Sequence, residues 1–255
     1  MKSFATSGWI RTILSGLATL LRHNSTSRQH PWRTLLLTGI TLGKVASLRL
    51  SIDSRARART REDFLETAIQ AASRTGLWLE FGVAGGQSIN LIANRVESVT
   101  IHGFDSFYGL PEDWNRSLRK GAFSRHGMLP FVRSNVSLHP GLFADSLPAF
   151  LQRTAEFVSF VHIDSDLYSS AIFVLGQIHE RVRHGTVLAF DEFITPSPSK
   201  NEAHAFREFL RRTGFGYEVV VSYLGEMGDI KVGVRLLRPP SSAGCGPDQP
   251  RIPRD

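Results

Sequence analysis

The 255 residues of the chain suffice for one α/β domain with attachments or for two small domains. With 42% hydrophobic and 21% charged residues the composition is that of an ordinary globular protein, and no run of about 18 apolar residues suggests a membrane span. The single cysteine, Cys245, excludes an intrachain disulfide and a cysteine-based metal cage.

The net charge of +7 is spread unevenly along the chain. Residues 1–61 contain eleven Lys and Arg against one acid, whereas residues 62–255 contain nineteen Lys and Arg against twenty-two Asp and Glu. The basic character therefore belongs to an N-terminal extension. Since a nucleic-acid enzyme more often carries its basic patch beside its active site, we do not expect a nucleic-acid substrate.

The extension, residues 1–61, has three interpretations that its sequence leaves open. Residues 9–22 place apolar side chains along one face of a predicted amphipathic helix, and residues 32–50 form a second apolar segment. The extension is a helical cap over the pocket or in a homodimer contact, a basic helix on an anionic membrane surface, or an organelle targeting peptide. We expect a cytoplasmic protein, with membrane-peripheral and organelle locations as the alternatives.

Short apolar runs alternate with helical stretches from residue 77 onward, a pattern typical of βαβ units and a parallel sheet. A helix is expected at about 62–75, before the first strand, and another at about 201–213. The runs YEVVVSY and DIKVGVRLL then predict a final antiparallel pair, and residues 238–255 have the composition of a disordered tail. The expected parallel strands are 77–82, 99–105, 136–140, 157–164 and 186–191.

A glycine-rich turn, LEFGVAGGQS, follows the first strand. Glycines at this point let the backbone pass close to a ligand, and the next helix offers free N–H groups to a carboxylate or phosphate. The second strand ends at Asp105, about twenty residues further on, where an acid can accept hydrogen bonds from ribose hydroxyls. A plain βα turn and an Asp helix cap are the alternatives, and the spacing also suits NAD.

Acidic residues end two apolar strands that lie further along the chain. FVHIDSDLYSS contributes Asp164 and Asp166, and GTVLAFDEFI contributes Asp191 and Glu192. Ligands of an open α/β sheet bind beyond the carboxyl ends of its strands, so Asp164 and Asp191 are expected within reach of one ion. Carboxylate oxygens suit Mg²⁺ or Ca²⁺. Helix caps and loop salt bridges are the alternative, but acids that cluster without a cation would repel one another.

The segment 106–135 is long for a loop, mixes aromatic and charged residues, and is expected to cover the cofactor as a lid. His126 in this loop is a weak candidate for a base, because a lone loop histidine is more often solvated. His162 precedes Asp164 on an apolar strand, so we expect a core or pocket-lining histidine and not a metal ligand.

Five segments, in this order and spacing, resemble class I S-adenosylmethionine-dependent methyltransferases, and most of all the macrocin-type sugar O-methyltransferases. The resemblance implies a Rossmann-like α/β domain at 62–237 behind a helical N-terminal extension. Its sheet would be doubly wound, mostly parallel and seven-stranded, with a C-terminal antiparallel pair. The segments are LEFGVAGGQSI, HGFDSFYGLPEDW, GLFADSLPAFL, HIDSDLYSS and GTVLAFDEF.

The same resemblance implies S-adenosylmethionine as the cofactor. Ala84 stands where the family signature has its middle glycine. The implied cofactor contacts are Glu80, Gly82, Ala84, Gly86, Ser88, Asp105, Ser106 and Asp145.

GTVLAFDEFI is also similar to the metal-binding segment of catechol-type O-methyltransferases, which implies a divalent cation, expected to be Mg²⁺, on Asp164, Asp191 and Glu192. Glu192 stands where that type has Asn, and Leu167 where it has its lysine base. Asp164 or Asp191 is therefore expected to take the proton from a hydroxyl of a small acceptor, such as a sugar, polyketide or lipid.

Two other functions compete with methyl transfer. A nicotinamide-dependent oxidoreductase uses a similar sheet, although no Tyr-x-x-x-Lys pair follows the glycine turn. A degenerate methyltransferase fold could also act as a non-catalytic, membrane-associated scaffold through the basic extension. The intact glycines and acids argue against such decay.

Overall fold

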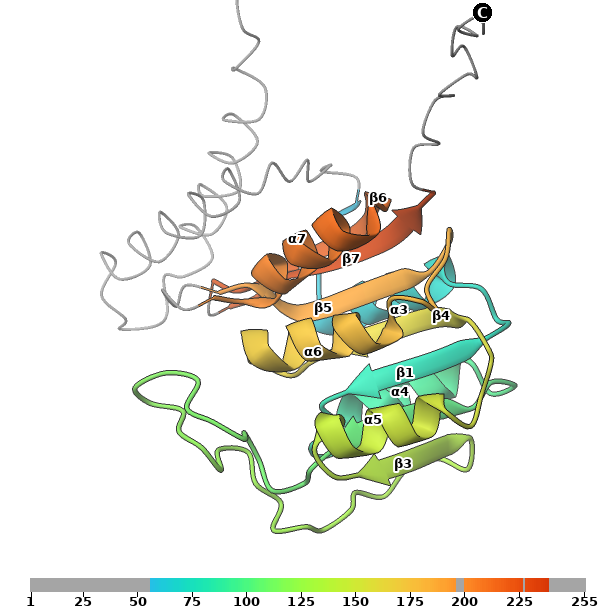
Figure 1. The fold of residues 1–255 in the computed structure, drawn as a ribbon. Coiled ribbons are helices and arrows are strands. Elements are labelled where there is room, and N and C mark those ends of the chain that lie inside the picture. The colour runs from blue at the N-terminus through green and yellow to red at the C-terminus, as the bar shows by residue number, and fades with distance from the viewer. Residues whose placement is uncertain (1–55, 196–199, 227, 239–255) are drawn as a thin grey trace, which may run out of the picture.

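The computed structural model describes residues 56–195, 200–226 and 228–238 (Figure 1). The predicted helix at 9–22, the apolar segment at 32–50 and all but the first residue of the tail lie outside these residues. No helix in the described part of the chain is long and apolar enough to cross a bilayer.

The sheet has seven strands in the order β3-β2-β1-β4-β5-β7-β6, which confirms the predicted fold. Neighbouring strands from β3 to β5 run parallel, and β7 runs antiparallel to both β5 and β6. The strands are β1 (Leu77–Phe81), β2 (Ile101–Asp105), β3 (Val136–Pro140), β4 (Val158–Ile163), β5 (Val187–Ile194), β6 (Gly216–Leu224) and β7 (Ile230–Leu237).

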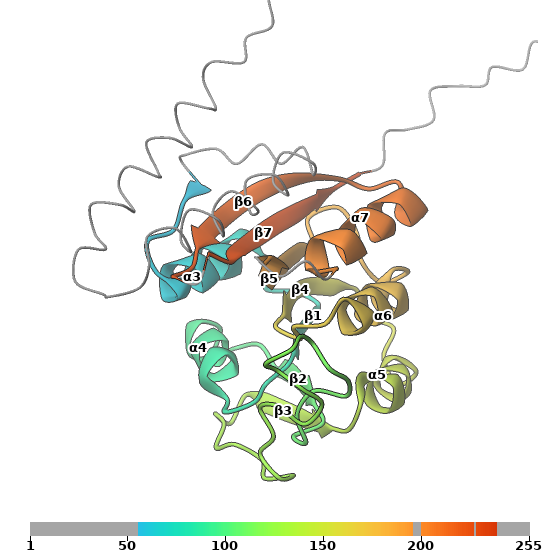
Figure 2. The ribbon, with the colours of Figure 1, turned by 90° about the vertical axis from the view of Figure 1, so that its left-hand side faces the viewer.

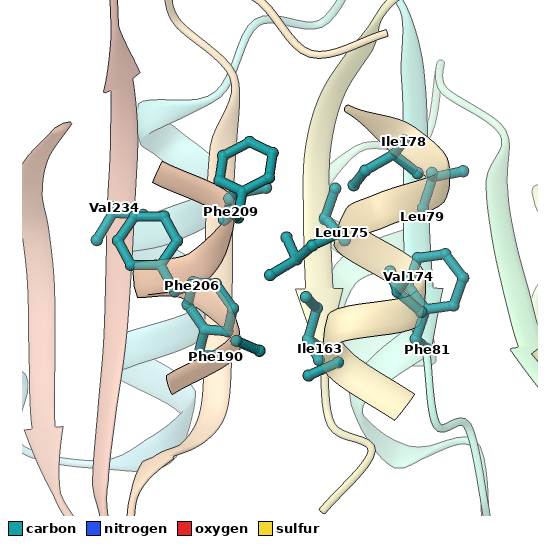
Figure 3. Packing of buried hydrophobic residues seen from close by; sticks show 14 of the residues in the cluster. Leu79, Phe81, Ile163, Val174, Leu175, Ile178, Phe190, Phe206, Phe209 and Val234 are labelled. Carbon is teal, nitrogen blue, oxygen red and sulfur yellow. The ribbon is translucent and has the colours of Figure 1, made fainter. Parts of the chain in front are cut away.

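Helices cover both faces of this sheet (Figure 2). The helices α3 and α4 pack on one face, where their apolar side chains join one buried cluster, and α5, α6 and α7 pack on the other, where they join a second. Figure 3 shows part of the second cluster, with Val174 of α6 and Phe206 of α7 between the helices and the strands. The helices are α3 (Arg61–Ala71), α4 (Gln87–Arg95), α5 (Phe143–Leu151), α6 (Tyr168–Ile178) and α7 (Glu202–Thr213).

The double cover explains why the central strands are apolar along their whole length. Every residue of β1 and of β4 is buried, as in parallel sheets that have helices on both faces. The helix before β1 is shorter than predicted and begins at Arg61, after Thr60, whose side chain accepts a hydrogen bond from the Asp63 N–H. The predicted domain boundary at residue 62 remains a prediction.

The connection between β2 and β3 contains no helix, although parallel neighbours are usually joined by one. Residues 106–135 instead form a long irregular loop. Five of the seven large hydrophobic side chains that are exposed in the described residues belong to this loop. They are Tyr108, Phe123, Met128, Leu129 and Phe131.

Candidate active site

The glycine turn after β1 is tied to the end of β4 by backbone contacts. Gly82 has a φ of +92°, and a Cβ there would lie 1.8 Å from the carbonyl oxygen of Asp164, so only glycine fits. The Asp164 N–H donates to the carbonyl of Phe81 at 2.8 Å. Glycine at position 82 therefore brings the glycine turn after β1 into direct contact with Asp164 at the end of β4.

Asp105, at the end of β2, receives its hydrogen bonds from the backbone. Its Oδ2 accepts from the N–H groups of Val83 and Ala84, both at 2.8 Å, and its Oδ1 accepts from Phe107 at 2.7 Å. Ala84 has a φ of +43° in the turn. The acid expected to contact a ribose thus also fixes the shape of the glycine turn.

The start of α4 has no side-chain cap. Its N-cap residue is Gly86, and no acid stands in the first turn, which leaves helix N–H groups available to a ligand. The long loop crosses this end of the helix, because Asn90 donates to the carbonyl of Phe131 and accepts from the N–H of Arg133. This contact agrees with the expectation that residues 106–135 lie near the cofactor turn.

A chain of buried charges connects β1 with β5. Glu80 is fully buried, and its Oε1 lies 2.7 Å from Nδ1 of His162. Nε2 of His162 lies 3.6 Å from Oδ1 of Asp191. Burial opposes protonation, but Asp191 and Glu80 outweigh it and raise the pKa of His162 to about 10. His162 is buried as expected, and its ring lies between the carboxylates of Glu80 and Asp191, which favour the protonated form.

Asp191 is neutralised by two further cations. Its Oδ2 accepts from Nζ of Lys231 at 2.7 Å and its Oδ1 from Nε of Arg61 at 3.0 Å, while Nη2 of Arg61 donates to Asp164 at 2.7 Å. Burial alone would raise the pKa of Asp191, but His162, Lys231 and Arg61 hold it well below its usual range. Both oxygens are occupied, so Asp191 is a poor proton acceptor.

A second set of acids gathers on the other side of Asp164. Carboxylate oxygens of Asp164, Asp166 and Glu192 all lie within 4.8 Å of one another. Burial and mutual repulsion raise the pKa of Asp164 to about 6 and of Asp166 to about 7, and raise that of Glu192 well above its usual value. Oε2 of Glu192 is buried without a hydrogen-bond partner among the described residues.

The predicted metal ligands thus lie on the same side of the sheet, but they belong to two overlapping groups. These ligands are Asp164, Asp191 and Glu192. Asp164 is common to both: one group adds His162 and Asp191, the other Asp166 and Glu192. The second group offers only oxygen atoms, one of them unpaired, which fits the ligand preference of Mg²⁺.

Asp166 is a site residue that the sequence pattern displays but that we did not assign. It has a φ of +61°, a strained conformation for a residue with a side chain. Its carboxylate has no hydrogen bond or ion pair with any described residue. A second acid two positions after Asp164, at the end of a buried strand, is the signal that could have identified it.

Three other predicted residues are not members of the two acidic groups. His126 is exposed with a φ of +53°, and no contact joins its ring to the acidic groups in the described residues. Asp145 is exposed in the first turn of α5. The hydroxyl of Ser106 donates to the carbonyl of Gly109 at 3.2 Å.

Residues 79–193 match a family model described as a methyltransferase domain. The search of curated proteins gave no significant match.

The fold is similar to that of the calicheamicin methyltransferase CalS11, with 19% sequence identity and a TM-score of 0.55 over 82% of this chain and 94% of that one. The O-methyltransferase NovP aligns at 20% identity and a TM-score of 0.48, over 80% and 97% of the two chains. An O-methyltransferase from Bacillus cereus aligns at 17% identity and a TM-score of 0.46, over 89% and 100%.

Proposed function

We propose that the chain, whose residues 79–193 match a methyltransferase domain, is a class I S-adenosylmethionine-dependent methyltransferase that methylates a hydroxyl group of a small acceptor. One observation carries this proposal: the glycine turn and the acidic group meet through the contact of Gly82 with Asp164. A methyl donor on the turn would therefore lie beside carboxylates that can hold and deprotonate a hydroxyl. A sugar, polyketide or lipid-linked acceptor would suit this chemistry.

The turn and its neighbours suit S-adenosylmethionine, which supplies a methyl group on a positively charged sulfur. The uncapped start of α4 would receive its methionine end. Asp105 keeps lone pairs for ribose hydroxyls even while it accepts three backbone hydrogen bonds. Glu80 would not contact S-adenosylmethionine itself, since its side chain is fully buried and its carboxylate pairs with His162.

A divalent cation would be held by Asp164 and Glu192, with Asp191 as the third ligand and Asp166 beside the ion but outside its ligand set. Three like charges within 4.8 Å of one another and the unpaired Oε2 of Glu192 support this assignment. Asp191 could join only if Arg61 releases its oxygen. Such an ion, when bound, lowers the pKa of a nearby hydroxyl and orients its oxygen.

We assign the proton acceptor to Asp166, in place of Asp164 or Asp191. Asp166 is the one acid of the group whose carboxylate has no partner among the described residues, whereas Arg61 holds both Asp164 and Asp191. As the acceptor oxygen forms its bond to the methyl carbon, the bond from carbon to sulfur breaks. S-Adenosylhomocysteine leaves, and the hydroxyl proton passes to Asp166.

The test is transfer of a labelled methyl group from S-adenosylmethionine to a panel of glycosides, polyketides and lipid-linked sugars, with and without a chelator. We expect activity to disappear on chelation and to return with Mg²⁺. Asp166→Asn should lower kcat by about 10²- to 10⁴-fold, while Asp113→Asn, an exposed loop variant, should not. Full activity after chelation would remove the cation from the mechanism, and full activity of Asp166→Asn would remove that base.

A further inference from the structure

Arg125 holds its guanidinium group over the glycine turn and has no side-chain partner among the described residues. Its Nη1 lies 3.7 Å from the point where a Cβ on Gly85 would stand. Its Nε is shielded from solvent and has no hydrogen-bond partner among the described residues. A shielded donor on a cation is costly to leave unpaired, so this position calls for an anion.

The backbone of the long loop fixes Arg125 at this place. The Arg125 N–H donates to the carbonyl of Phe107 at 3.0 Å, and the N–H of Gly127 donates to the same carbonyl at 3.0 Å. Phe107 is itself buried and bonded to Asp105 through its N–H. The arginine is therefore anchored to the end of β2 and does not depend on the exposed part of the loop.

A second source of positive potential faces the same turn. The helix α4 begins one residue after Gly86, which offers no side-chain acceptor, and its first turn contains no acid. No acid of the described residues forms an ion pair with Arg125. The guanidinium and the uncapped N–H groups thus converge on one small region beside Gly85.

We propose that Arg125 binds the α-carboxylate of the methionine part of S-adenosylmethionine. This inference rests on the proposed function, because it assumes that the methyl donor occupies the turn. A carboxylate matches the planar fork and the charge of a guanidinium, and Nη1 is the nitrogen that lies next to the turn. The loop then does more than cover the pocket: it recognises the amino-acid end of the methyl donor.

The experiment compares two ligands by calorimetry: S-adenosylhomocysteine, and 5′-methylthioadenosine, which lacks the carboxylate and amino groups. Arg125→Met should weaken S-adenosylhomocysteine about ten- to a hundredfold and leave methylthioadenosine within about twofold. The matched control is Arg119→Met, since Arg119 lies in the same loop, is exposed and pairs with Asp113. It should change neither affinity.

A ligand-side measurement covers the case in which Arg125→Met does not fold. Wild-type protein should bind the carboxamide of S-adenosylhomocysteine more weakly than the acid by a similar factor. Unchanged binding of S-adenosylhomocysteine to Arg125→Met, or an equal loss for both ligands, would overturn the proposal and assign Arg125 to an acceptor group or to loop structure. If the wild type binds neither ligand, the proposed function fails and this inference fails with it.

Discussion

Two regions on the carboxyl side of the sheet hold acidic side chains in different ways. At the end of β2, Asp105 is held by three backbone N–H groups. On β5, one residue past its pairing with β4, Asp191 is held by the side chains of Lys231 and Arg61, with His162 behind it. Backbone donors cannot be removed by substitution or titration, whereas each side-chain cation can. The first region should therefore tolerate change better than the second.

The largest effect is expected when a cation is removed from the β5 region. Lys231→Met would leave Asp191 ionised with one fewer partner, and both side chains are less than 10% exposed. Breaking a buried ion pair from one side costs about 3–5 kcal/mol, so the free energy of unfolding in urea should fall by that amount.

The double variant Lys231→Met with Asp191→Asn should recover part of this loss, because the buried side chain at position 191 is then neutral and no longer needs the lysine. A loss below about 1 kcal/mol for Lys231→Met alone would show that the two regions do not differ in this way.

A smaller effect is expected in the β2 region. Asp105→Asn keeps one oxygen but replaces the other acceptor with a donor, so one backbone hydrogen bond of the turn is lost. We expect a loss of about 1–2 kcal/mol in the free energy of unfolding, measured in the same urea titration. Asp145→Asn, on an exposed acid, is the control and should stay within about 0.5 kcal/mol. A loss as large as that of Lys231→Met would contradict the comparison.

The smallest effect concerns acid pH and the uncharged histidines beside the β2 region. Nδ1 of His102 lies 3.1 Å from Nε2 of His139, and burial, together with repulsion from His139 when that ring is protonated, lowers the pKa of His102 to about 4. The unfolded chain takes up this proton near pH 6.5, so stability should be lost as the pH falls from 6.5 toward 4.

The ring is partly exposed, and we expect about 1 kcal/mol or less between pH 7 and pH 5.5. His102→Leu should show a shallower pH dependence in thermal unfolding at matched pH values. An unchanged slope in that variant would assign the acid sensitivity to other groups.

The difference between the regions also explains what the sequence could reveal. Strands and their acid ends follow from alternation and burial, which are local, so all seven strands and the edge that carries Asp164 and Asp191 were predictable. The partners of Asp191 were not. Lys231 lies 40 residues away on β7 and Arg61 lies 130 residues away on α3, within a basic run that we attributed to the extension.

Arg125 escaped the sequence analysis for a related reason. Its relevance comes from the place where an irregular loop crosses Gly85, and loop paths have no periodicity from which to predict them. The acids of the motif were visible in the sequence, whereas the cations that organise them, and the position of Arg125 without a partner among the described residues, became visible only in three dimensions.

The contact between Gly82 and the carbonyl of Asp164 sets how closely β1 and β4 approach each other at the candidate active site. A single methyl group there would have to push β1 away from β4, and every donor atom on one strand would move with respect to every acceptor atom on the other. Nucleophilic displacement depends on close alignment of the reacting atoms, so in the proposed reaction this backbone contact would act as the spacer that sets the distance between methyl donor and acceptor. Fine adjustment of reactivity in this chain would then come from the side chains around the spacer, and not from the spacer itself.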